Sequence, residues 1–441
     1  MGARKEEEEE EACKRKDPHF ETRGRRLRLC HHHHRHYIMY AASSHKSPLV
    51  IELGARVVRA GISGEMAPRR SYLLEDDELA LQSNGYAFSS KGAPSRKEWL
   101  RRVLWVLRSV YFEKLLLRPR GRRVYVCAPL FGLPRKCEEA VYEALFEHFD
   151  APLVHVAPSP GLIILPTGCL AGVSVDVGFR ETRVVAVVGG TIVANSFFSS
   201  PSGMRMLLEK LQVAAVVADG NEKDMSGVKL SMEALEGLAE RLFGAASETS
   251  EASSAFFYAR RRQQNGTRAK TAVRMRIDNP QDIANEVFFS PSAEASIAAA
   301  FANCLDACPH DILRLAAQNV VVVGECASFR GFKASFLACA KDALSKKSRL
   351  SALDIAVHDS DIPPGHHCWL GASLAAAALS DELVKTSVTA EMYRATGPGG
   401  GPPMDEFDLR THHLSSDDDG EDERKFVVRT VEKAPERVAA M

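Results

Sequence analysis

The sequence lacks several features that would assign it to a broad class at once. It has no apolar run close to 18 residues, so we expect no transmembrane helix. Its 57 basic and 57 acidic residues leave no net charge, which argues against a general binder of nucleic acid or of membrane surfaces. Its start, MGARKEEEEEE, has no apolar segment typical of a secretory signal. We therefore expect a cytoplasmic protein that does not insert into membranes.

Motifs for metal binding and hydrolysis are also missing. The ten cysteines are scattered, mostly inside apolar runs, and predict reduced core thiols rather than a disulfide framework. Cys304 and Cys308 are one helical turn apart, and a metal half-site is the alternative, but no second pair has matching spacing. The run His31–His34 is interpreted as low-complexity tail, with metal binding as the alternative. We predict no metal site and no catalytic residue.

Both ends of the chain have a biased amino-acid composition, whereas the central region has the apolar pattern of a folded protein. Residues 1–46 contain six consecutive glutamates and Arg-rich and His-rich stretches, and residues 396–441 contain Gly-Pro runs and an acidic patch. Neither end has enough apolar surface to offset the entropy lost on ordering. We predict a disordered N-terminal extension over 1–46 and a disordered acidic C-terminal tail over 396–441.

Apolar spacing in the middle predicts alternating strands and helices. Strands are expected at 49–54, 57–62, 124–128, 153–156, 173–178, 184–188, 191–194, 319–324 and 355–357, and helices at 97–117, 134–149, 158–165, 204–211, 232–243, 293–305, 329–345 and 370–384. The stretches 66–96 and 244–264 are predicted to be loops, so Arg260–Arg262 is interpreted as surface charge on a loop. His366 and His367 are also predicted to lie in a loop.

A strand, acid, x, Gly pattern occurs twice, at Glu52 and Gly54 and again at Asp176 and Gly178. A glycine hairpin lets backbone N–H groups approach phosphate oxygens, and an acid at the strand end can hold Mg²⁺ through water. A third buried strand ends at Gly324, where an open sheet presents its ligand crevice. Three such strand ends in order predict an α/β protein with the two-lobed ATPase fold of actin, heat-shock-70 chaperones and sugar kinases. Each lobe is then a mixed sheet flanked by helices.

The residues also carry a family resemblance. Segments 48–69 and 172–190 resemble the two phosphate motifs of actin and its relatives, and 319–332 resembles the adenosine motif. Segments 285–292, 369–372 and 390–397 resemble later parts of the same pattern. The chain is identified as a member of the actin-related protein family over 48–397. The resemblance implies a smaller lobe over 47–166 and 360–395, with a shortened outer subdomain, and a larger lobe over 167–359.

Within the family, short segments are similar to the divergent actin-related subunit at the pointed end of the dynactin complex. These are Gly178–Thr182, Ala157–Ser159 and Cys308-Pro309. The stretch 70–99 is short, so the long polymer-contacting loop of actin is expected to be absent. The resemblance implies, as partners, the actin-related filament subunit and other dynactin pointed-end proteins, with an indirect link to dynein.

The candidate nucleotide pocket departs from the family pattern. Its residues are Glu52, Gly54, Ala55, Arg59, Asp176, Gly178, Gly324 and Glu325. Arg59 stands where the resemblance implies a phosphate-binding Lys, and Ser159 where it implies the Gln that orients the attacking water. The other departures are Glu52 for Asp, Leu53 and Ala55 for polar residues, Phe179-Arg180 for Asp-Gly, Ala239 for Lys and Glu325 for Gly.

These departures remove the residue that positions water and an acid near the metal. Positioning and electrostatics supply most of phosphoryl-transfer catalysis, so we expect no competent ATP hydrolysis. The residues by themselves assign no cofactor, and ATP or ADP with Mg²⁺ stays the candidate. The function expected is a non-catalytic structural subunit that caps the pointed end of an actin-related filament in dynactin and so supports dynein-driven microtubule transport. The alternatives are a nucleotide-binding actin-like protein with weak ATPase activity and an actin-related subunit of a chromatin-remodelling complex.

Overall fold

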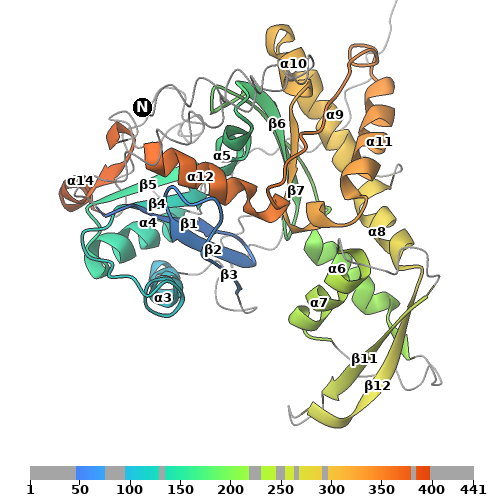
Figure 1. The fold of residues 1–441 in the computed structure, drawn as a ribbon, viewed down its shortest axis with the longest axis horizontal. Helices are drawn as coiled ribbons and strands as arrows, with labels where there is room; N and C mark the ends of the chain where they lie inside the picture. Colours follow the sequence, from blue (N-terminus) through green and yellow to red (C-terminus); the bar gives the residue numbers. More distant parts are fainter. Residues whose placement is uncertain are drawn as a thin grey trace, which may run out of the picture.

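A computed structural model describes residues 46–74, 95–128, 135–217, 230–244, 254–262, 268–290, 296–378 and 384–397. Apart from Lys46, Thr396 and Gly397, both predicted tails lie outside these residues. The run His31–His34 and most of the stretch 70–99, where we expect the long loop of actin to be absent, also lie outside them. Figure 1 shows sheets flanked by helices on both sides, with a two-stranded hairpin extending away from the rest. This arrangement confirms the predicted α/β class.

A six-stranded sheet begins the fold. Its order is β14-β5-β4-β1-β2-β3. The strands are β1 (Leu49–Leu53), β2 (Val57–Ile62), β3 (Arg70–Leu73), β4 (Val124–Ala128), β5 (Leu153–Pro158) and β14 (Val388–Thr389). The pairs β1–β4 and β4–β5 are parallel and the other pairs are antiparallel, so the sheet is mixed.

A five-stranded sheet forms the second centre, in the order β13-β6-β7-β8 with β9 also paired to β7. Its strands are β6 (Ala171–Val177), β7 (Thr182–Val188), β8 (Thr191–Ile192), β9 (Phe198–Ser200) and β13 (Val320–Val323). Strand β13 runs parallel to β6, whereas β6 and β7 form an antiparallel hairpin. A separate three-stranded sheet has the order β10-β12-β11, with β10 (Val216–Val217), β11 (Ser254–Arg262) and β12 (Arg268–Asp278).

Helices cover each large sheet on its outer face. The outer face of the six-stranded sheet packs against α3 (Arg96–Arg108), which continues as the π-helix η2 (Ser109–Lys114), and against α4 (Arg135–Glu143), which continues as η3 (Ala144–His148). The five-stranded sheet shares its outer core with α6 (Met204–Ala214), α7 (Met232–Phe243), α8 (Pro280–Phe289), α9 (Ile297–Ala307), α10 (His310–Ala317) and α11 (Phe332–Ser345). We call these two assemblies the six-stranded half and the five-stranded half.

A shared apolar layer joins the halves. It contains α5 (Ser159–Ile164) and α12 (His367–Ala378). Because successive strand residues face opposite sides, Leu49 and Ile51 enter the outer core whereas Val50 enters the shared layer. The two helices approach so closely that a Cβ on Gly371 would lie 1.8 Å from the carbonyl oxygen of Leu162. The last described helix, α14 (Ala390–Thr396), lies beside the six-stranded sheet.

Several local predictions were wrong. Residues Arg70–Leu73 form an edge strand, and Ile355–Val357 contribute only a single bridge, from Val357 to Val320. His367 is buried at the start of α12, with its Nδ1 3.1 Å from the carbonyl oxygen of Ile163. His366 ends a 3-10 turn, η7 (Pro364–His366).

The predicted loop over 244–264 also contains a strand. Within β11, Ala255 and Phe257 are buried whereas Phe256 and Tyr258 are exposed, which is the alternation of a half-buried strand. Arg260–Arg262 therefore belongs to a strand, paired with β12. The prediction followed the charge of the stretch, whereas backbone pairing to a partner strand and burial of every second residue decide the structure.

Candidate functional site

Two hairpins with the same local geometry meet at the candidate site. In the first, the Gly54 N–H donates to the Val57 carbonyl at 3.0 Å, and in the second the Gly178 N–H donates to the Glu181 carbonyl at 3.0 Å. Figure 1 shows the hairpins β1–β2 and β6–β7 in the two neighbouring sheets. The strand, acid, x, Gly pattern that occurs twice in the sequence thus forms two similar hairpins.

The repeat extends to the residues that face each acid across the hairpin. Glu52 lies opposite Arg59 in the first hairpin, and Asp176 lies opposite Arg183 in the second. Arg59 pairs with its opposite acid, with Nη1 3.1 Å from Glu52 Oε1, whereas Arg183 pairs with Glu181 at 3.2 Å. The two hairpins thus have the same backbone geometry but different ion pairs.

The third strand end reaches the same place through a close backbone approach. Gly324 follows β13 with φ at +100°, and a Cβ there would lie 2.1 Å from the Val177 carbonyl oxygen. Only glycine fits so near the end of β6 with this backbone conformation. The chain then turns into the 3-10 segment η6 (Glu325–Ser328), so Glu325 is brought to the hairpins.

Arg59 holds two carboxylates at once. Besides Glu52, its Nη2 donates to Glu325 Oε1, and Glu325 comes from the five-stranded half. The Arg59 side chain is only 7% exposed, whereas that of Glu325 is 51% exposed. A Cβ on Gly365 would lie 3.0 Å from Arg59 Nη2 and 2.9 Å from Glu325 Oε1. The backbone of η7 at Gly365 therefore packs directly against this ion pair.

The pKa values of Glu52 and Arg59 are set by burial and by the charges of the neighbouring side chains. Burial raises the pKa of Glu52 to about 7; Arg59 opposes this, and the negative charges of Asp176 and Glu325 add to it. Burial acts to lower the pKa of Arg59, but the carboxylates of Glu52 and Glu325 hold it above its ordinary value. Among the described atoms, Glu52 Oε2 and Arg59 Nε are buried without a hydrogen-bond partner.

The remaining predicted residues occupy less polar surroundings. Ala55 lies half-buried in the β1–β2 turn and offers only a methyl group. Ser159 is buried at the start of α5, and Ala239, a residue of α7, is fully buried in the core of the five-stranded half. In the second hairpin, Phe179 packs against that core. Arg180 is partly buried there, and its burial, helped by Arg205, lowers its pKa to about 10.

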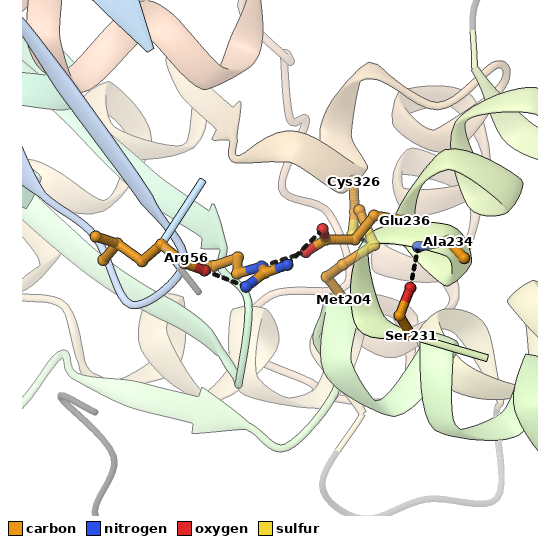
Figure 2. A network of polar contacts seen from close by, with 7 residues as sticks. Arg56, Met204, Ser231, Ala234, Glu236 and Cys326 are labelled. Carbon is orange, nitrogen blue, oxygen red and sulfur yellow. Dashed lines mark hydrogen bonds and ion pairs between the residues drawn. The ribbon is translucent and has the colours of Figure 1, made fainter. Parts of the chain in front are cut away.

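Sequence reasoning missed Arg56, a second arginine of the β1–β2 hairpin. Arg56 Nε lies 2.7 Å from Glu236 Oε1 and its Nη2 lies 2.9 Å from Oε2, so the pair is bidentate (Figure 2). Arg56 also donates to the carbonyl of Leu74. Glu236 lies on α7, whose first turn is capped by Ser231 at the N–H of Ala234. The partners are 180 residues apart in sequence, so no local pattern connects them.

The described residues do not fit a nucleotide phosphate at Arg59 while Glu325 keeps its place. A phosphate oxygen there would have to displace the Glu325 carboxylate from the guanidinium. Glu52 and Asp176 have the oxygen atoms that Mg²⁺ prefers, but Glu52 is already bound by Arg59. Within the described ranges, no group of three or more His, Cys, Asp or Glu side chains could hold a metal ion. Cys304 and Cys308 lie buried in the core of the five-stranded half.

Comparison with known proteins agrees with this architecture. Residues 102–219, less than half of the chain, match the family model described as Actin; this segment includes the β6–β7 hairpin. The chain has the actin fold.

Two curated relatives align with this actin-like chain at low identity. Actin-related protein 10 of Dictyostelium discoideum is 24% identical over 193 residues, which are 38% of this chain and 39% of the relative. An actin-like protein of Neurospora crassa is 25% identical over 191 residues, which are 38% of this chain and 50% of the relative. The chain thus spans half or less of these relatives. In the part of the chain that the structure describes, none of the helices has the length and apolar character needed to cross a bilayer.

Proposed function

We propose that this chain is a non-catalytic, actin-related structural subunit that caps the pointed end of an actin-related filament in a dynactin-type complex. It would be located in the cytoplasm, at the cytoskeleton. Its partners would be the actin-related filament subunit and other pointed-end proteins, with dynein as an indirect partner.

One observation carries the non-catalytic part. Arg59, the cation that faces the strand ends, is bound by Glu52 and Glu325 of the chain itself. A phosphoryl-transfer site needs such a cation free to neutralise charge on the transferred group. Ser159 and Ala239 also place short side chains where the family resemblance implies Gln and Lys. We therefore assign the chain no cofactor and no catalytic residue.

The capping part rests on the actin fold and on the family resemblance in the sequence. An actin-type filament grows by heterologous contacts, in which one face of a subunit meets a different face of the next. A subunit that has one of these faces but not the other ends the filament. The similarity to Actin-related protein 10 of Dictyostelium discoideum is consistent with a divergent actin-related subunit of this kind.

Affinity purification of the full chain from its own cells, with mass spectrometry of the recovered proteins, tests the capping part. Recovery of the actin-related filament subunit with dynactin pointed-end proteins is the expected result. Recovery of chromatin remodellers, or of no actin-family partner, would overturn it.

Phosphate release tests the non-catalytic part. Purified chain with Mg²⁺ and ATP should release phosphate at the rate of a buffer blank. Turnover that scales with the concentration of the chain would instead support the weak-ATPase alternative.

A further inference from the structure

Both arginines of the β1–β2 hairpin pair with glutamates of the other half of the molecule. Arg56 and Arg59 belong to the six-stranded half. Glu236 lies on α7 and Glu325 lies directly after β13, so both belong to the five-stranded half. The pairs join residues 180 and 266 positions apart. The hairpin therefore has two separate ionic contacts with the opposite half.

The contact of Arg56 has the geometry of a strong pair. Two guanidinium nitrogens meet the two carboxylate oxygens of Glu236, and the side chains are only 9% and 15% exposed. Arg56 also donates to the carbonyl of Leu74, which fixes the guanidinium from its own half. Figure 2 shows Glu236 directed at Arg56, with Met204 and Cys326 beside it. A fork-to-fork contact of this kind fixes orientation as well as distance.

The contact of Arg59 occupies the position where an anion would bind. Its guanidinium is surrounded by Glu52, Glu325 and the negative field of Asp176. An incoming polyphosphate would meet these carboxylates before it met a free cation. Glu325 is half-exposed, so its carboxylate is the partner that an external anion could displace.

We propose that the β1–β2 hairpin is a built-in clamp between the two halves, in which the Glu325 carboxylate occupies the anion position at Arg59 and Arg56 binds Glu236. The closed arrangement then needs no bound polyphosphate. This inference rests on the non-catalytic part of the proposed function and adds what stands in place of the nucleotide.

Removing the internal anion tests the Arg59 contact. In Glu325→Gln the side chain keeps its shape but loses its charge, so Arg59 becomes available to an external anion. Inorganic tripolyphosphate titrated into the full chain by calorimetry should bind Glu325→Gln at least about tenfold more tightly than wild type, equivalent to about 1.4 kcal/mol. Asp150→Asn is the matched control, because it removes the charge of an exposed pair with Arg120 inside one half. Equal affinity in wild type and Glu325→Gln would overturn the assignment of Glu325.

Hydrogen exchange tests the clamp itself. The double variant Glu236→Gln with Glu325→Gln should lose at least about tenfold of the amide protection around the β1–β2 turn, and each single variant should lose less. Asp150→Asn should leave this protection unchanged. Unchanged protection in a double variant with a native circular dichroism spectrum would overturn the clamp. Neither measurement depends on a filament partner, so the capping proposal stands or fails separately.

Discussion

Glu52 is an acid whose surroundings differ strongly from water. It is an acid at the end of β1 with Arg59 opposite, Asp176 and Glu325 nearby, and one buried oxygen without a partner. Its pKa of about 7, against an ordinary 4.5, means that the folded chain keeps a proton that the unfolded chain releases. Where the folded state binds more protons, the free energy of unfolding falls as the pH rises.

The contribution of Glu52 to stability should be fully present below about pH 4.5 and lost as the pH rises through about 7. Glu52→Gln cannot titrate, so the loss of unfolding free energy between pH 5 and pH 8 should be smaller than in wild type. Urea denaturation at the two pH values measures this. Glu98→Gln is the control: its ion pairs with Arg101 and Arg102 lower the pKa of Glu98 to about 2, so it titrates below this range. A wild-type pH dependence in Glu52→Gln would contradict the assignment.

At the scale of elements, the contact of α5 with α12 positions the two halves. Both helices belong to the shared apolar layer, and Gly371 lets their backbones touch at Leu162. The hairpin β1–β2 is fixed to the same layer, because Trp369 Nε1 donates to the Val50 carbonyl at 3.2 Å. The site therefore depends on a helix pair to which only Ser159 among the predicted residues belongs.

Gly371→Ala should lower the free energy of unfolding by about 3 kcal/mol, the upper part of the usual range for overpacking. The added Cβ would lie 1.8 Å from the Leu162 carbonyl oxygen, so the helices have to separate. Urea denaturation checks the value. Gly237→Ala in α7 is the matched control, since a Cβ there meets nothing within 4 Å. It should stabilise the chain by about 1 kcal/mol through helix propensity. Destabilisation of the same size in both variants would argue against the packing explanation.

At the scale of the whole molecule, the shared layer couples the two large sheets. Residues from β1, β4, β5, β7 and β13 enter one apolar cluster with α5 and α12. Neither half can expose its inner face without exposing that of the other half. We therefore expect the two halves to unfold as one cooperative unit.

Tryptophan fluorescence can test this coupling, because the sequence has three tryptophans. Trp369 is fully buried in the shared layer, and Trp99 is buried in the outer core of the six-stranded half. One variant should keep only Trp369 and a second only Trp99, with Phe at the other two positions. Each urea transition followed by fluorescence should coincide with its own transition by circular dichroism. A Trp99 transition displaced from the circular dichroism transition would show that the halves unfold separately.

Local pattern was enough to predict most elements and the repeat. The strand Val57–Ile62 and the helix Met232–Phe243 have the predicted bounds, since their apolar periodicity agrees with their burial. The strand over Ser254–Arg262 was missed because its stability comes from pairing with β12 rather than from its own residues.

The sequence by itself determined the α/β class, the repeated hairpins and the acids and glycines at their ends, because each depends on neighbours along the chain. Only the tertiary structure decided which charges meet. Glu325 reaches Arg59 across 266 positions and Glu236 reaches Arg56 across 180, after the packing of two sheets against α5 and α12. Ion pairs between halves depend on the relative position of the sheets, and that position is set by the summed burial of the shared layer rather than by any local pattern.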